Sequence, residues 1–167
     1  MLIQNLLNLL LRAAEHPSGN GLTFHHSNSK RNPSSISYKA LLELIEQRSM
    51  QLQEVENIDT KVVLIYFTDH LDSIIWFWTV VGAGGIPCIC PPLAKDLDQR
   101  QNYVRYLLDL LERPLVITTR SLSLEFLAVE GLRVVTIGTL EALLVCAHAT
   151  VLHYLLLNNI PRLKDQS

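Results

Sequence analysis

Charged residues are scarce in this sequence. Lys, Arg, Asp and Glu supply 18% of its 167 residues, whereas a typical soluble domain carries about 25%. The 14 basic and 16 acidic residues leave a net charge of −2. This balance excludes the strongly basic surface that binds nucleic acid, so we expect no nucleic acid partner.

Cysteines are few, and their number is odd. Cys88, Cys90 and Cys146 cannot build a disulfide framework, and no other ligands stand at the spacing of a zinc finger or zinc ribbon. We interpret all three as reduced thiols that are buried as small apolar residues, which predicts a cytoplasmic protein. The histidines are scattered, and we expect them on loops and helix surfaces: His16, His25, His26, His70, His148 and His153.

The motifs of common nucleotide and hydrolase sites are absent. The sequence has no G-x-x-x-x-G-K-[ST] phosphate loop and no G-x-S-x-G nucleophile elbow. The glycines of segment 82–85 are predicted to end a helix and precede a strand, whereas dinucleotide-binding glycines follow a strand and open a helix. Asp69 and Asp72 flank a predicted helix start, where capping and the helix dipole explain them. We therefore assign no catalytic, cofactor-binding or metal-ligating residue.

Apolar residues are abundant, at 49% of the chain. This content excludes a disordered chain and predicts one domain with a core, or part of a larger domain. Two windows, 73–94 and 142–161, contain no charged residue. Glycines and prolines divide the first into a helix, a turn and a short strand. The second is long enough to cross a bilayer, but His148 and His153 argue against a span, so membrane association is kept only as an alternative.

Hydrophobic periodicity predicts alternating helices and strands. The expected helices cover residues 2–13, 38–54, 71–81 and 96–111, and the expected strands cover 21–25, 36–38, 61–67, 86–90, 115–118 and 133–137. The apolar runs at 61–67 and 86–90 are typical of parallel strands buried on both faces. The run Ile74–Trp78 would make its helix apolar nearly all round, which predicts burial between the sheet and another layer. The order of elements predicts an α/β fold of right-handed parallel βαβ units.

Three segments, in this order, carry a family resemblance. Segment 6–17 ends in Arg-Ala-Ala-Glu-His-Pro, segment 36–42 is Ile-Ser-Tyr-Lys-Ala-Leu-Leu, and segment 80–88 runs from a helix end into Gly-Ala-Gly-Gly-Ile-Pro-Cys. They resemble the opening helix and the first two core motifs of adenylate-forming (AMP-binding) enzymes. That superfamily includes acyl-CoA ligases and the adenylation domains of nonribosomal peptide synthetases. Ala40 stands where the family usually has Glu. Segments 72–78 and 98–100 are most similar to fungal synthetase-like adenylation proteins of secondary metabolism.

The resemblance implies a domain assignment. Residues 1–143 would form a truncated, incomplete first subdomain of the AMP-binding large domain, and residues 144–167 would be a divergent tail. In the family, the phosphate loop, the acidic residues that hold magnesium and ribose, and the catalytic lysine lie beyond this region. The resemblance thus implies no cofactor in this fragment, and ATP and magnesium only in full-length relatives.

The functional expectation has alternatives. The family implies a protein related to ATP-dependent carboxylate ligases, inactive on its own. A non-catalytic protein that docks a partner through exposed apolar surface is one alternative, because a partial domain leaves such surface uncovered. A small membrane-associated protein that uses window 142–161 is the other.

Overall fold

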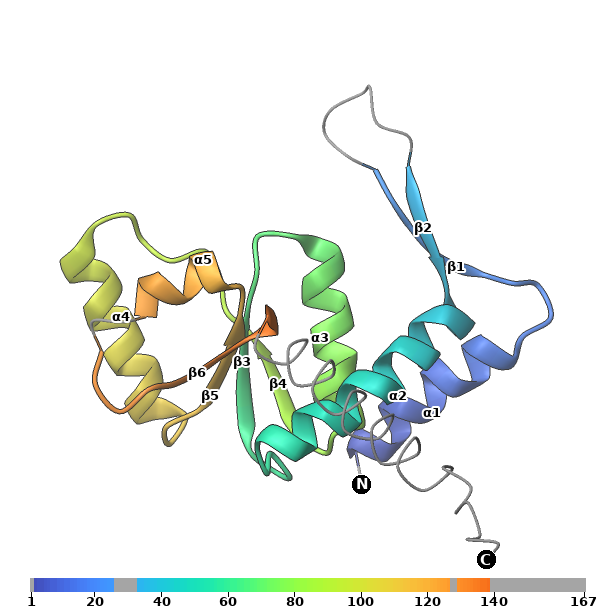
Figure 1. The fold of residues 1–167 in the computed structure, drawn as a ribbon, viewed down its shortest axis with the longest axis horizontal. Helices are drawn as coiled ribbons and strands as arrows, with labels where there is room; N and C mark the ends of the chain where they lie inside the picture. Colours follow the sequence, from blue (N-terminus) through green and yellow to red (C-terminus); the bar gives the residue numbers. More distant parts are fainter. Residues whose placement is uncertain (1, 26–32, 127–128, 139–167) are drawn as a thin grey trace, which may run out of the picture.

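The computed structural model describes residues 2–25, 33–126 and 129–138 (Figure 1). Its elements are α1 (Leu2–Glu15), β1 (Gly21–Phe24), β2 (Ser34–Ser37), α2 (Tyr38–Val55), β3 (Val62–Tyr66), α3 (His70–Gly82), β4 (Ile86–Ile89), α4 (Leu97–Leu110), β5 (Leu115–Thr118), α5 (Arg120–Ser123), the 3-10 helix η1 (Leu124–Phe126) and β6 (Arg133–Thr136). The predicted helices and strands are confirmed to within a few residues, while α5 and η1 were not predicted. The tail predicted over 144–167 and the apolar window 142–161 lie outside the described residues.

Four parallel strands form the main sheet, in the order β4-β3-β5-β6. The chain moves from β3 to β4 in one direction and then crosses back past β3 to reach β5. Because right-handed crossovers in opposite directions lie on opposite faces, the sheet is covered by helices on both sides. β1 and β2 pair separately as an antiparallel ribbon that projects from the body (Figure 1). This arrangement confirms the predicted α/β class.

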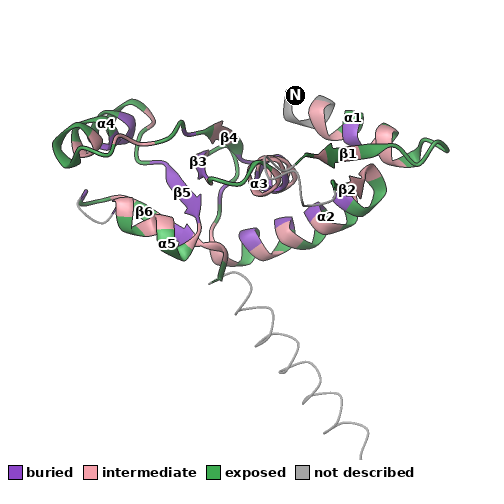
Figure 2. Cartoon of the chain, turned by 90° about the horizontal axis from the view of Figure 1, so that it is seen from above, coloured by how far each residue is buried: buried purple, intermediate pink, exposed green. Residues whose placement is uncertain are grey.

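Helix α3 lies between the sheet and the pair α1 and α2 (Figures 1 and 2). Trp76, only 2% exposed, packs with Ile65 and Val80 in the core on this face. Its ring stacks on Phe67, with centroids 6.4 Å apart, and the Arg48 guanidinium lies 5.3 Å from the ring centre. The burial predicted for the aromatic run is therefore confirmed.

The opposite face of the sheet packs against α4 and η1. Leu64 and Val116 of the central strands contact Val104 and Leu108 of α4 and Phe126 of η1 in a second core cluster. Successive residues of β3 and β5 thus alternate between two cores, as expected of parallel strands covered on both faces. This confirms the prediction for residues 61–67.

The prediction that residues 86–90 form a buried strand is wrong in part. Ile86 and Ile89 of β4 are 44% and 58% exposed, because among the described residues β4 pairs only with β3 and lies at the edge of the sheet. A short apolar run predicts a strand but does not show whether that strand lies inside the sheet or at its edge. The directions of the crossover connections decide the position. The charge-free window 73–94 does divide into α3, a turn and β4, as predicted. No described helix combines the length and apolarity that a bilayer span requires.

Candidate functional site

The carboxyl edge of the parallel sheet is where an α/β fold would place a ligand. In open sheets of this type, ligands bind beyond the carboxyl ends of the strands, near the point where the strand order reverses. Here that point lies between β3 and β5, which end at Tyr66 and Thr118. A cavity of about 430 Å³ opens at this edge, beside Tyr66, His70 and Cys90.

Tyr66 is the central polar residue of this edge. Its hydroxyl donates a 2.8 Å hydrogen bond to Oε2 of Glu125 and accepts a 3.4 Å bond from the Leu93 amide. The Tyr66 ring meets Phe126 edge to face at 5.2 Å. The Thr118 hydroxyl donates a 2.6 Å bond to the Tyr66 carbonyl. These bonds hold β3, β5 and η1 together at the edge.

The ionisation of Tyr66 is suppressed. Burial raises the pKa of its phenol above 10, and the hydrogen bond to the Glu125 carboxylate raises the pKa further. The hydroxyl therefore stays neutral and remains a donor at physiological pH. A neutral phenol whose proton is already held by Glu125 is suited to positioning, not to general base catalysis.

Cys90 lies next to this tyrosine but is not an activated nucleophile. Burial raises the pKa of its thiol to about 12, with smaller contributions from Cys88 and Glu125. A thiolate is the reactive form of cysteine, and this environment disfavours it. Cys88 and Cys90 are both free in the structure. The predicted burial is confirmed for Cys90, whereas Cys88 is only half-buried. The reduced state of these thiols stays a prediction, and Cys146 lies outside the described residues.

The start of α3 carries its own cap. Oδ1 of Asp69 accepts hydrogen bonds from the amides of Leu71 at 2.7 Å and Asp72 at 3.2 Å. The Ser73 hydroxyl donates back to the Asp69 carbonyl at 2.9 Å. The amide donors that would attract a phosphate at a helix start are thus already engaged. The predicted capping role of Asp69 is confirmed.

The glycine-rich turn lies at the opposite, amino edge of the sheet. It ends α3, as predicted, and leads directly into β4. Gly84 has φ of +86°, and a Cβ on Gly82 would lie 2.5 Å from the Ser49 hydroxyl oxygen of α2. These glycines serve a left-handed turn and a close helix contact. The geometry supports the rejection of a dinucleotide site.

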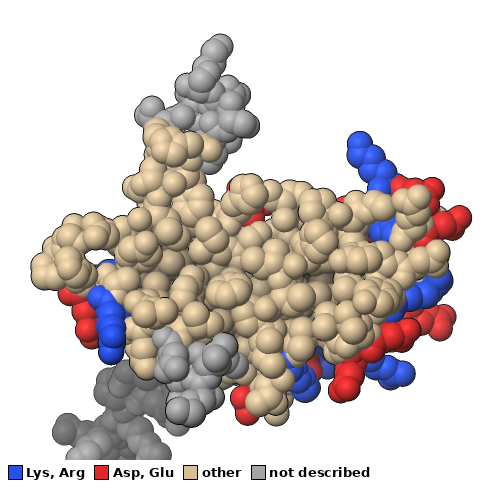
Figure 3. Space-filling model, turned by 180° about the vertical axis from the view of Figure 1, so that it is seen from behind, with Lys and Arg blue, Asp and Glu red and all other residues tan. Residues whose placement is uncertain are grey.

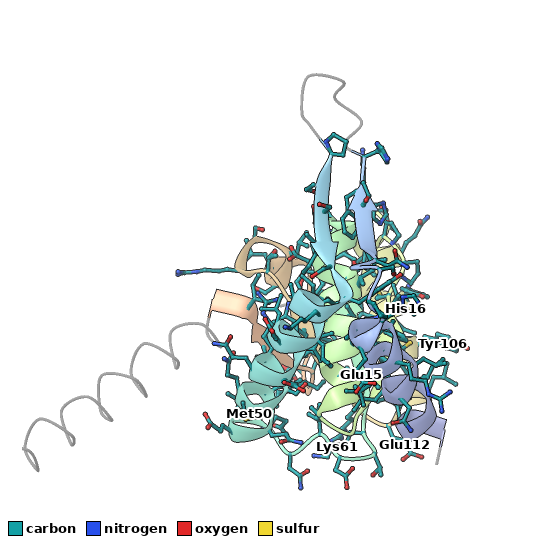
Figure 4. All side chains as sticks on the ribbon, turned by 90° about the vertical axis from the view of Figure 1, so that its right-hand side faces the viewer. Glu15, His16, Met50, Lys61, Tyr106 and Glu112 are labelled. Carbon is teal, nitrogen blue, oxygen red and sulfur yellow. The ribbon has the colours of Figure 1, made fainter. Side chains whose placement is uncertain are left out.

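Charged side chains gather at the same amino edge. Glu56, at the end of α2, pairs with Arg133 at 2.6 Å and with Lys61 at 3.6 Å. Together with Glu112 and Arg113 they border a second cavity of about 430 Å³. Figure 4 shows Lys61 and Glu112 projecting from this end of the molecule. Because Glu56 bridges residues that precede β3 and begin β6, the cluster joins elements rather than leaving an unpaired cationic pocket.

The histidines do not assemble a metal site in the part of the chain that is described. His16 bonds the Ser18 hydroxyl at 2.8 Å on the surface. His25 and His70 are exposed and border one cavity of about 310 Å³ with Asp69. No group of three His, Cys, Asp or Glu side chains within residues 2–25, 33–126 and 129–138 is arranged to hold a metal ion. His26, His148 and His153 fall outside these ranges.

Comparison with known sequences identifies relatives. The chain is 34% identical over 143 residues to the nonribosomal peptide synthetase acyN of Ascocoryne sarcoides. This alignment covers 84% of the chain and 15% of the relative. It is 33% identical over 138 residues to the aspulvinone E synthetase melA of Aspergillus terreus, again over 15% of that protein. No family model matches the chain.

Solved structures show the same arrangement. The adenylation domain of a keto acid-selecting nonribosomal peptide synthetase module, bound to a keto acyl adenylate, matches with a TM-score of 0.68 and 26% identity. The match covers 81% of this chain and 25% of that one. The chain is a homologue of the adenylate-forming enzymes and corresponds to part of their adenylation domain. A fatty acid AMP ligase from Legionella pneumophila shares the fold, with a TM-score of 0.65 and 19% identity.

The comparisons confirm the family resemblance drawn from the three sequence segments. They also fix its extent, because this adenylation-domain segment spans only about 15% of its curated relatives. Within that span, sequence reasoning found the Asp69 cap but missed the pairing of Tyr66 with Glu125. No local pattern signals that pair, because the two residues are 59 positions apart.

Proposed function

We propose that this segment serves as a structural part of an adenylation domain and does not form an acyl adenylate on its own. In a longer enzyme, the reaction would be activation of a carboxylic acid by ATP with magnesium, in the synthesis of a secondary metabolite. The observation that carries the proposal is that the polar groups at the carboxyl edge of the sheet are already hydrogen-bonded. These groups, from the Tyr66 hydroxyl to the Asp69 carboxylate, are bonded to partners within the segment.

The chemistry of adenylation supports a structural role for this segment, with catalysis dependent on the rest of the domain. Attack of a carboxylate on ATP needs fixed positive groups and a metal ion around the phosphates. At the carboxyl edge, the described segment presents a neutral phenol and a neutral thiol, and the capped helix start offers its first amides to Asp69. The residues present therefore do not fit ATP and magnesium by themselves. The fungal synthetases among the relatives support the metabolic assignment.

ATP–pyrophosphate exchange tests the proposal. Purified chain is assayed with a panel of carboxylic acids that includes 2-oxo acids, aromatic acids and fatty acids. We expect no exchange above a blank without protein, while the intact adenylation domain of acyN, assayed with the same panel, is the positive control. Exchange that copurifies with the chain and is saturable in one acid would overturn the proposal.

A non-catalytic docking role is a second candidate, and exposed apolar side chains favour it. Ile89 on β4 and Leu97, Tyr106 and Leu110 on α4 are each more than half exposed. Figure 3 shows a broad area of one face without charged side chains, and Figure 4 shows Tyr106 projecting outward. Sedimentation tests this role: the chain should associate as concentration rises, and Leu110→Lys should reduce the association. A chain that stays monomeric would exclude a second copy of itself as the docking partner.

The cellular compartment belongs to the same proposal. Free Cys88 and Cys90 support a reducing compartment such as the cytoplasm. Imaging of the tagged chain in a fungal host would test this, and we expect a diffuse cytoplasmic signal. A signal confined to the secretory pathway would contradict it.

A further inference from the structure

The two edges of the main sheet differ in what their backbones offer. On β4, the amides of Ile86 and Cys90 donate to the carbonyls of Lys61 and Ile65, at 2.8 and 2.9 Å. Since backbone groups alternate in direction along a strand, Pro87 and Ile89 turn theirs away from β3. Proline has no amide hydrogen, so the outer edge of β4 offers only the Ile89 donor. A proline at this position blocks the addition of another strand.

The β6 edge has no such block. Along each parallel strand, the backbone amide and carbonyl of successive residues point alternately to one neighbouring strand and to the other. The registers of β3 with β5 and of β5 with β6 therefore place the backbone groups of Arg133 and Val135 toward β5. Those of Val134 point to the outer side of β6. β6 contains no proline. Among the described residues, no strand pairs with its outer side. The Val134 amide and carbonyl therefore face away from the sheet.

The side chains of β6 suit a strand inside a sheet. Val135 is 7% exposed and belongs to the core on the α3 side, whereas Val134 packs against the core on the α4 side. Apolar residues on both faces are typical of interior parallel strands, because helices cover both faces there. The hydrophobic cores on both faces of the sheet thus extend to β6, although among the described residues β6 forms strand hydrogen bonds with β5 only.

The topology also fixes where the next strand would be added. After the reversal at β3, the chain adds β5 and then β6 on the same side of the sheet. Consecutive strands are usually neighbours, so a following parallel strand would lie beside β6. The matched adenylation domain is about four times as long as the region it shares with this chain, since that region is 25% of it.

We propose that the open edge of β6, and not that of β4, receives a parallel strand from the remaining part of an adenylation domain. The inference rests on the proposed structural role, and it names the partner and its point of contact. Strand addition would bond the outward Val134 amide and carbonyl, and it would cover the uncompleted end of both cores.

Coexpression in trans tests the contact. The chain is produced with the tagged segment of acyN that follows the region matched to it, and the recovery of the chain with that segment is measured. We expect Val134→Pro, which removes the outward amide hydrogen of β6, to lower recovery at least tenfold. Ile89→Pro removes the outward amide hydrogen of β4 and is the matched control, with recovery like the unaltered chain. Equal recovery of all three, or loss with Ile89→Pro alone, would overturn the proposal.

Hydrogen exchange in the unaltered chain tests the contact without a substitution, so a variant that fails to fold cannot affect the result. In the unaltered chain, peptides that contain Val134 should exchange at least tenfold more slowly when the acyN segment is bound, while peptides that contain Ile89 should not change. Unchanged exchange at Val134 in a complex that does form would overturn the assigned contact. Failure of the unaltered chain to bind the segment would overturn it too.

Two further outcomes separate the proposals. A complex that forms through Val134 but shows no ATP–pyrophosphate exchange supports strand addition and counts against the longer enzyme's proposed activity. A homodimer of the chain alone that Val134→Pro abolishes would show that a second copy occupies β6, which overturns the choice of partner.

Discussion

The Tyr66 hydroxyl and the Glu125 carboxylate are joined by a 2.8 Å hydrogen bond across 59 residues of sequence. The bond ties the end of a central strand to the short 3-10 helix that follows β5. It also consumes the most favourably placed hydroxyl of the carboxyl edge. The edge at which an α/β fold normally binds a ligand is therefore stabilised by internal bonds in this segment.

Removal of this bond should cost measurable stability. Tyr66→Phe leaves a partly buried carboxylate without its donor, and we expect the free energy of unfolding to fall by about 1–2 kcal/mol. Tyr106→Phe is the matched control, because Tyr106 is 58% exposed and no change above about 0.5 kcal/mol is expected. Urea unfolding measures both. Equal stability of the two variants would show that the bond contributes nothing.

Stability should fall at alkaline pH. The pKa of the Cys90 thiol is raised from 9.0 to about 12 in the folded protein. A raised folded pKa means that the stabilisation is fully present below pH 9 and is lost as the pH rises toward 12. The raised pKa of Tyr66 acts in the same direction above pH 10.

Urea unfolding under reducing conditions, at pH 8 and pH 10.5, checks this dependence. We expect the unaltered chain to lose stability between the two values and Cys90→Ala to lose less. If both proteins respond equally, Cys90 is not the titrating group.

Loss of the α3 cap should destabilise the domain. Asp69→Ala removes the acceptor of two amides, and caps of this kind are worth about 1 kcal/mol. Asp69→Asn keeps an acceptor oxygen and should restore most of the loss. Thermal unfolding monitored by circular dichroism compares the three proteins. A stable Asp69→Ala variant would contradict the capping role.

Two glycines separate backbone strain from steric overlap. Gly131 has φ of +82° and open space where a Cβ would lie, whereas a Cβ on Gly84 would meet Asp59 Oδ1 at 2.9 Å. Gly131→Ala should cost about 1–2 kcal/mol through left-handed backbone strain alone. Gly84→Ala should cost about the same, because the exposed Asp59 side chain can swing aside and leave only the left-handed backbone strain. Chemical unfolding of both variants decides whether the overlap adds to the strain.

Local signals predicted the elements well. The apolar run at β3, the cap Asp69 and the glycines after α3 act through hydrogen bonds and periodicities that span a few residues. The order of three motif segments was enough to indicate the family. The carboxyl edge was predictable only as a location, because the partners that occupy it come from distant segments.

What the sequence by itself determined was thus the type and order of the longer helices and the strands, and the resemblance to the adenylate-forming enzymes. The tertiary structure alone decided that β4 lies at an edge with Ile89 exposed, that Tyr66 meets Glu125, and that β6 keeps an open side. The physical reason is the crossover. Its direction depends on how α3 and α4 pack against opposite faces of the sheet, and no short stretch of residues encodes that packing.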